Sequence, residues 1–344
     1  MATIVANYDG PLFLVVAKTF YNPDLIKANF QFPLPTEYYA AHFPLFPLLI
    51  RIFSFIGGYP YSMLFVTLAS SVLALYFFNK FISQYADKRG TLFLTFFFAI
   101  FPARWLIVRS VGSPEPLFIA ATIASIYYFQ KNKYLNAGVW GLVAQLTKST
   151  GILLFIAYFA YLIFPQLKKL ATSHFTKWSE VLNLKKTLPI YLIPVSLVTV
   201  FVFYAFRMGD FGAYFRSGDN IHLFFPPFAI FNYSAPWVGT FWLEEIIFIY
   251  LLVTLGLSRL IKQKTGILIW YVGLFFASTL FVSHRDLMRY SLPVIPFLFA
   301  AFSEVLTSKE FKIVVAFIAI PIYLFSLAYI SQNVMPISNW SPFL

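Results

Sequence analysis

Long apolar segments recur along the whole chain, and they limit its fold more than any other feature. Of the 344 residues, 60% are hydrophobic and 11% are charged, and the mean hydropathy is +0.76. A helix of about 20 apolar residues crosses the hydrocarbon core of a bilayer and satisfies its own backbone there. We therefore predict an all-α polytopic membrane protein with spans at roughly residues 61–79, 91–108, 116–130, 134–147, 150–164, 188–206, 241–260, 265–283, 289–306 and 311–330.

The first 60 residues differ from the remainder. Segment 43–56 is short and proline-rich and contains Arg51, so it predicts a helix at the membrane interface rather than a span. We therefore divide the chain into residues 1–60, a first outer loop with interfacial helices, and residues 61–344, a transmembrane domain. Within the second part, residues 207–240 are rich in glycine and proline and predict a long outer loop.

The basic residues are dispersed between the apolar segments, which argues against nucleic-acid binding despite the net charge of +12. Fifteen of the 25 basic residues, mostly lysines, lie in alternate loops, which the positive-inside rule places in the cytoplasm. Seven of the ten on the opposite face are arginines, the residue that binds phosphate through two parallel hydrogen bonds. We therefore expect any chemistry on the extracytoplasmic or lumenal face.

Composition excludes several kinds of site. The chain has no cysteine, so it has neither disulfides nor a catalytic thiol. Its four histidines lack the spacing of metal ligands, and no glycine-rich phosphate loop links a strand to a helix. We expect no organic cofactor and no metal, although a divalent cation remains open.

Two carboxylates are candidates for chemistry. A carboxylate beside a lipid-embedded domain is costly unless it is solvated or used, and Asp9 has this position. Asp9-Gly10-Pro11 is also a good helix start, so an N-cap is the other interpretation. Glu115, between two prolines, is either a functional acid or a first-turn residue that complements a helix dipole.

The basic candidates have similar alternatives. Arg285 and Arg289 are four residues apart and share one face of a helix, where they either bind phosphate or anchor a span end. Lys148 stands at a helix start, where the dipole disfavours a cation, which favours a ligand role.

Several short islands together resemble one family of membrane glycosyltransferases. Their order and approximate spacing over residues 7–155 resemble those of PIG-V-type mannosyltransferases, and one further island resembles related GT-C mannosyltransferases. The islands are Asp9-Gly10 with Phe13 and Ala17, His42-Phe43-Pro44-Leu45-Phe46-Pro47, Phe101-Pro102-Ala103, Ser113-Pro114-Glu115-Pro116-Leu117-Phe118, Thr147-Lys148-Ser149-Thr150-Gly151 and His284-Arg285-Asp286-Leu287-Met288-Arg289-Tyr290.

The resemblance implies a GT-C-type bundle of about ten or eleven transmembrane helices. It implies inverting transfer of a sugar, mannose first, from a polyprenyl-phosphate carrier to a hydroxyl of a glycan, glycolipid or protein. Asp9 and Glu115 would be catalytic, and Arg285, Arg289, Lys148 and His42 would bind substrate. Arg109 and Asp24 lie outside the islands and are two further candidates for substrate binding. The other interpretations are an anchor at a span end for Arg109, a turn residue for Asp24 and a hydrogen-bonded structural role for His42.

The chain departs from the family pattern in four respects. Tyr8 stands where the family has Trp, Phe13 where it has Tyr, and Lys148 where it has Arg. The family's first span is also missing, and we expect the natural chain to have an additional N-terminal helix.

Two other functions remain open. A polytopic transporter or lipid flippase would share the spans but predicts broken helices and charges near the middle of the membrane. The ionisable residues here cluster at span ends, which favours an interfacial enzyme. A non-catalytic assembly subunit would have no need of Asp9.

Overall fold

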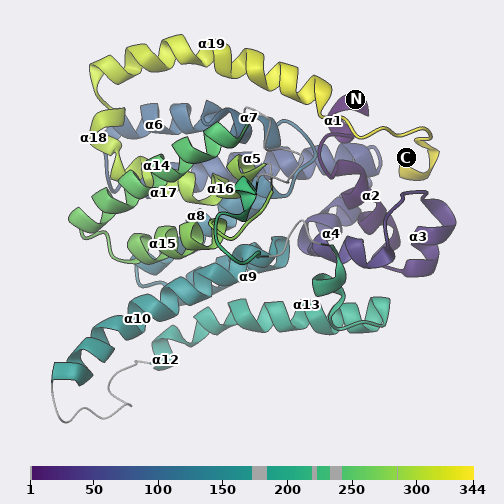
Figure 1. Cartoon of the computed structure of the whole chain (residues 1–344), viewed down its shortest axis with the longest axis horizontal. Coiled ribbons are helices and arrows are strands. Elements are labelled where there is room, and N and C mark those ends of the chain that lie inside the picture. Colours follow the sequence, from purple (N-terminus) through teal and green to yellow (C-terminus); the bar gives the residue numbers. More distant parts are fainter. Residues whose placement is uncertain (1, 173–183, 219–222, 233–241, 285) are drawn as a thin grey trace.

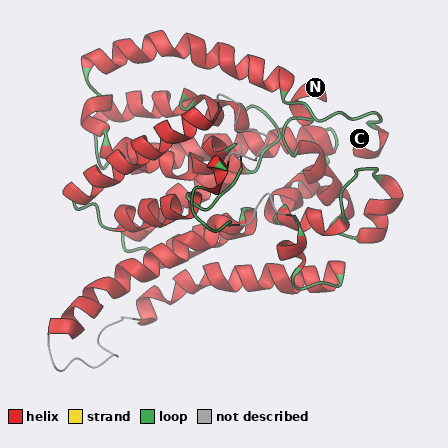
Figure 2. Ribbon diagram, in the orientation of Figure 1, coloured by secondary structure: helices red, strands yellow, loops and turns green. Residues whose placement is uncertain are grey.

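The computed structural model describes residues 2–172, 184–218, 223–232, 242–284 and 286–344. Helices make up most of this part of the chain, and two isolated β-bridges join Asn7 to Val334 and Leu223 to Val282 (Figure 2). The short N-terminal helices lie at one end of the molecule, beside the C-terminal tail (Figure 1). They are α1 (Ala2–Val5), α2 (Gly10–Thr19), α3 (Pro23–Asn29), the 3-10 helix η1 (Thr36–Ala41) and α4 (Leu45–Ile52).

The longer helices extend away from this end (Figure 1). They are α5 (Tyr59–Ile82), α6 (Lys88–Ile100), α8 (Glu115–Gln130), α9 (Tyr134–Thr147), α10 (Ile152–Thr172), α13 (Leu192–Met208), α14 (Trp242–Lys262), α15 (Ile267–Thr279) and α19 (Lys309–Gln332). Four short helices accompany them: α7 (Ala103–Val108), α16 (Leu287–Ser291), α17 (Ile295–Ala301) and α18 (Ser303–Leu306). Short pieces between them are η2 (Ser149–Gly151), α12 (Leu184–Thr187), η3 (Leu188–Tyr191), η4 (Ala213–Arg216), η6 (Ala229–Phe231) and η7 (Leu292–Val294), and η8 (Ser341–Phe343) follows in the tail.

Helix α8 lies at the centre of the bundle and is buried along nearly all of its length. It packs mainly against α5 and α9. Small residues permit this close approach, as in other membrane bundles. In α9, a Cβ at Gly138 would lie 2.0 Å from the carbonyl oxygen of Pro189, so this glycine lets the start of the α13 segment pack against α9.

Three helices of the described part are long and apolar enough to cross a membrane: Tyr59–Ile82, Leu188–Met208 and Lys309–Gln332. The other segments predicted as spans are also helical but shorter or more charged; α14, for example, contains Glu244, Glu245, Arg259 and Lys262. An all-helical protein with membrane-spanning helices is therefore what the structure supports, and the ten-span bundle remains a prediction.

One of the predicted spans is not a continuous helix. Segment 91–108 divides into α6 and α7 at Pro102. Proline removes a backbone donor and clashes with the preceding turn, which accounts for the break. The prediction of a single span was wrong in this respect. Segment 289–306 is different, because α16, the 3-10 turn η7 and α17 follow one another directly as one apolar helix over Leu287–Ala301, and α18 comes after it.

The basic loops gather at the end of the bundle opposite α1–α4. Gln84, after α5, donates to Gln130, at the end of α8, at 3.3 Å. A Cβ at Gly90, in α6, would lie 3.0 Å from Thr307, before α19. The segments between α5 and α6, after α8 and before α19, which we predict to be cytoplasmic, thus share one end of the molecule, and the side of the membrane they face stays a prediction.

The C-terminal tail joins the N-terminal segment. The Met335 amide donates to the Ala6 carbonyl at 2.8 Å, and the Asn7 side chain donates to the Ile330 carbonyl at 2.7 Å. Asn333 in turn donates to the Asn7 side chain at 3.2 Å. These bonds fix the backbone immediately before Asp9. Buried apolar residues of the first 60 positions form one hydrophobic cluster with residues of α5, α13 and η4 and with Phe343.

Candidate active site

Asp9 ends the segment that the C-terminal tail holds. It precedes α2, but its side chain makes no capping hydrogen bond to that helix. Its carboxylate instead lies 3.5 Å from the Arg289 guanidinium and is 36% exposed. The N-cap interpretation therefore does not describe the side chain, which is turned toward a charged cluster and remains open to a ligand.

Glu115 is the centre of this cluster. Its carboxylate is 2% exposed and accepts hydrogen bonds from Lys148 Nζ at 2.8 Å and from Arg289 Nε at 2.8 Å. Its other oxygen accepts from the Ser113 hydroxyl. Burial alone would raise the pKa of Glu115, but Arg289 and Lys148 outweigh burial and hold that pKa well below its usual range. Glu115 thus stays charged and fixes two cations.

Arg289 bridges the two carboxylates. Its guanidinium, 11% exposed, contacts Glu115 through Nε and Asp9 through a terminal nitrogen. The same guanidinium lies 4.4 Å from the centre of the Tyr8 ring. The ring and the carboxylates together restrict its orientation, so the terminal nitrogens face the exposed Asp9 side of the cluster.

We define the charge row as Asp9, Arg289, Glu115 and Lys148, in which acids and bases alternate and the formal charges cancel. Its members come from the segment before α2, from α16, from the first turn of α8 and from the residue after α9. Residues up to 280 positions apart therefore meet at one end of the bundle.

A second ion pair lies next to the charge row. Arg104 Nε lies 3.1 Å from Asp286 Oδ1, and the two side chains are 4% and 10% exposed. Arg104 also donates to the Tyr8 hydroxyl at 3.4 Å and lies 4.1 Å from the Tyr329 ring centre. Burial raises the pKa of Asp286, and Arg104 opposes that effect. Through its contacts with Tyr8 and with Tyr329, the ion pair connects α7, α19 and the segment before α16.

Sequence reasoning missed this second pair, Ser113 and the role of Tyr8. Tyr8 was noted only as a departure from a family pattern, although its position next to Asp9 was a usable signal. Arg104 and Asp286 could not be paired from sequence, because they lie on distant segments that only the tertiary structure brings together.

His42 lies close to the row. It is 5% exposed and packs edge-on against Phe13, with ring centres 4.7 Å apart. Its Nδ1 is buried and, among the described residues, has no hydrogen-bond partner. Burial lowers the pKa of His42, and the negative charge of Asp9 partly opposes this. A neutral imidazole with an unused nitrogen suits a substrate hydroxyl better than a phosphate.

The other predicted residues are not part of the row. Asp24 is exposed in the first turn of α3, beyond the end of α2 that is remote from Asp9, and its amide donates to the Asn22 side chain at 2.9 Å. Arg109 donates to the Ala99 carbonyl, across the bend between α6 and α7. Arg285 lies outside the described residues. The structure thus gives Asp24 and Arg109 local structural contacts and brings Asp9, Glu115, Lys148 and Arg289 together.

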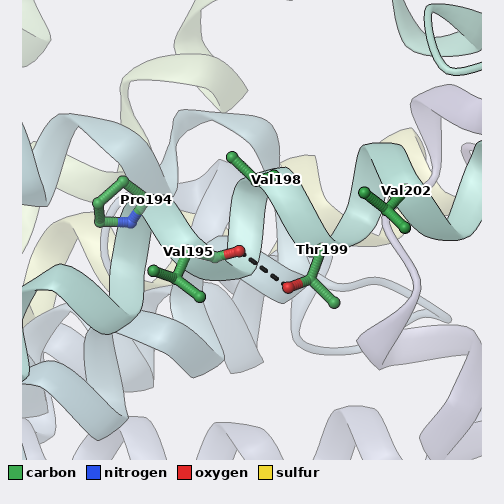
Figure 3. A pocket seen from close by; sticks show the side chains of 5 residues that line it. All are labelled: Pro194, Val195, Val198, Thr199 and Val202. Atoms are coloured by element: carbon green, nitrogen blue, oxygen red, sulfur yellow. Dashed lines mark hydrogen bonds between the residues drawn. The ribbon is translucent and has the colours of Figure 1, made fainter.

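Two further features bear on ligands. Among the residues that the structure describes, no group of three or more His, Asp and Glu side chains could hold a metal ion. An apolar groove of about 380 Å³ lies on α13, lined by Pro194, Val195, Val198, Thr199 and Val202 (Figure 3). It has no ionisable side chain and belongs to a helix long enough to cross a membrane, so it suits lipid chains.

Comparison of the chain with protein-family models and with curated proteins returned no match.

Proposed function

We propose that the protein is an inverting membrane glycosyltransferase that uses a polyprenyl-phosphate sugar as donor. In the reaction, an acceptor hydroxyl oxygen attacks the anomeric carbon and its proton passes to the Asp9 carboxylate. The bond between the anomeric carbon and the phosphate oxygen breaks, and its electron pair leaves with the polyprenyl phosphate. A general base is typically worth ~10²–10⁴ in rate.

The observation that carries the proposal is the state of Asp9. Its carboxylate does not cap α2, is 36% exposed, and lies 3.5 Å from a cation that a second, buried carboxylate orients. A carboxylate held in this way can approach an acceptor hydroxyl from the open side without losing its alignment.

The remaining members of the charge row have complementary roles in the proposal. Arg289 and Lys148 stabilise the charge that develops on the departing phosphate, since fixed cations there need no reorganisation. Glu115 is a positioning residue, because its oxygens are engaged by Arg289, Lys148 and Ser113. His42 Nδ1, which has no hydrogen-bond partner in the described part of the chain, accepts a hydrogen bond from a hydroxyl of the sugar or of the acceptor.

The location of the row favours an enzyme over a transporter. A transporter would place its ionisable side chains near the middle of the spans. Asp9, Glu115 and Lys148 instead lie at helix starts and ends, near the end of the bundle formed by α1–α4. Sugar and acceptor are those that the resemblance implies: mannose, and a hydroxyl of a glycan, glycolipid or protein.

A donor panel tests the proposal. Membranes containing the protein, and matched membranes without it, are supplied with radiolabelled polyprenyl-phosphate mannose, glucose, galactose or arabinose. We expect transfer of one sugar to a lipid- or protein-linked product that depends on the protein. Equal labelling in both membranes for every donor would reject the proposal.

A further inference from the structure

A cationic pocket lies at the end of α2 remote from Asp9. Its volume is about 430 Å³, and three cations and three apolar side chains line it: Lys18, Arg51, Arg207, Phe20, Leu25 and Leu48. The ten residues of α2 at about 1.5 Å each separate it from Asp9 by about 15 Å, so it is distinct from the charge row.

The three cations stand at converging helix ends. Lys18, Arg51 and Arg207 occupy the last turns of α2, α4 and α13. Arg51 donates to the Ala17 and Lys18 carbonyls at 3.2 Å, and Arg207 donates to the Phe20 carbonyl at 2.8 Å. Both guanidiniums lie over the Phe20 ring, at 5.9 and 5.7 Å from its centre. These contacts hold the arginines in place.

Helix capping does not account for the whole arrangement. Lys18 is held by the tail, since its Nζ donates to the Pro342 and Leu344 oxygens at 2.8 Å each. Carbonyl oxygens orient the two arginines but do not neutralise them, and in the described ranges neither arginine forms an ion pair with an aspartate or glutamate. The positive charges of Arg51 and Arg207 around one pocket repel each other, and an anion between them would relieve that repulsion. The charge row is different, since every cation in it contacts a carboxylate.

The walls and the position of the pocket indicate what kind of anion fits. Arg207 lies one residue before the end of the candidate span Leu188–Met208, which puts the pocket at the depth of lipid headgroups. Leu25 is 46% exposed and, with Phe20 and Leu48, adds an apolar wall that a soluble anion does not need. Arginines bind a phosphate through paired hydrogen bonds.

We propose that this pocket binds the phosphate of an anionic phospholipid, with the glycerol and upper acyl region against Phe20, Leu25 and Leu48. The inference does not depend on the sugar-transfer proposal. Inorganic phosphate and polyprenyl phosphate present the same chemistry, and they serve as comparison ligands.

The test is lipid binding to the purified full-length protein in neutral detergent, measured by native mass spectrometry. Phosphatidylglycerol, phosphatidylcholine, a polyprenyl phosphate and inorganic phosphate are titrated separately. We expect phosphatidylglycerol to bind in preference to phosphatidylcholine, and inorganic phosphate not to displace it. Arg51→Gln should weaken that binding about tenfold, since a charge-assisted hydrogen bond is lost.

Arg216→Gln is the matched control. It removes one positive charge from an exposed arginine that Asp210 already neutralises, and it should leave phosphatidylglycerol binding unchanged. Arg207→Lys is the second test variant. It keeps the positive charge but removes the paired hydrogen bonds of the guanidinium group, and it should also weaken phosphatidylglycerol binding. Arg51 is exposed, so its replacement leaves the fold intact more readily than that of Arg207.

Three outcomes would overturn the inference. Equal loss of phosphatidylglycerol binding in Arg51→Gln and Arg216→Gln would indicate a general effect of the net charge. Displacement of phosphatidylglycerol by inorganic phosphate would indicate a soluble anion, and tighter binding of the polyprenyl phosphate, lost in the same variants, would indicate the donor lipid.

Discussion

The two carboxylates that contact Arg289 have different surroundings. Glu115 is 2% exposed and accepts hydrogen bonds at 2.8 Å from both Arg289 and Lys148. Asp9 is 36% exposed, and its contact with Arg289 is 3.5 Å long. The tightly held carboxylate is suited to fixing cations, whereas the looser and more open one keeps an approach for a substrate. Residue type alone does not separate these roles; burial and the number of donors do.

The largest effect on stability is expected at Glu115. Glu115→Gln leaves Arg289 and Lys148 without their shared charge partner, and breaking a buried ion pair costs about 3–5 kcal/mol. Thermal unfolding in detergent measures this loss, with the exposed Glu304→Gln as control. Equal stability of the two variants would mean that Glu115 does not organise the row.

The difference in stability between the natural protein and Glu115→Gln depends on pH in a definite direction. Because the pKa of Glu115 is held below its usual range, its contribution is complete above the ordinary glutamate pKa of about 4.3 and is lost as the pH falls toward the lower folded-state pKa. The stability gap between the natural protein and Glu115→Gln should therefore be constant near neutral pH and shrink in acid. A gap that widened in acid would contradict this.

The next largest effect is expected at Arg289, which contacts both carboxylates. Arg289→Lys keeps the charge but cannot contact Asp9 and Glu115 together, so the turnover number should fall by about 10–100-fold, equivalent to roughly 1.5–3 kcal/mol for hydrogen bonds to charged groups. Arg109→Lys, at the bend between α6 and α7, is the control and should keep most activity. A turnover number in Arg289→Lys equal to that of the natural protein would mean that Arg289 acts through its charge alone.

The smallest effect is expected at an exposed pair. Arg216, 60% exposed, contacts Asp210 in the segment after α13. Arg216→Gln should change stability by less than about 1 kcal/mol, as for other surface ion pairs. Asp286→Asn at the buried Arg104 pair should cost about 3 kcal/mol or more. Similar losses in the two variants would remove burial as the explanation for the difference.

The sequence predicted the long helices better than it predicted the contacts between side chains. Apolar length located the long helical segments, and the islands contained Asp9, Glu115, Lys148 and Arg289, which the structure brings together and whose roles stay predictions. It did not place the break at Pro102, because a proline can also sit at a helix start. The Arg104–Asp286 pair and the contact of Arg289 with the Tyr8 ring depend on tertiary packing. Local sequence therefore indicates which groups are available, and the meeting of distant helices decides which of them pair.

The most direct test of the central claim compares Asp9→Asn with Asp24→Asn in the donor-dependent transfer assay. Both changes replace a carboxylate with an amide of the same shape, but Asp9 contacts Arg289 and Asp24 is exposed on α3. We predict that Asp9→Asn lowers the transfer rate by ~10²–10⁴, the usual effect of removing a general base, at normal protein levels, while Asp24→Asn remains active. Transfer by Asp9→Asn at the natural rate would contradict the assignment of Asp9 as the base.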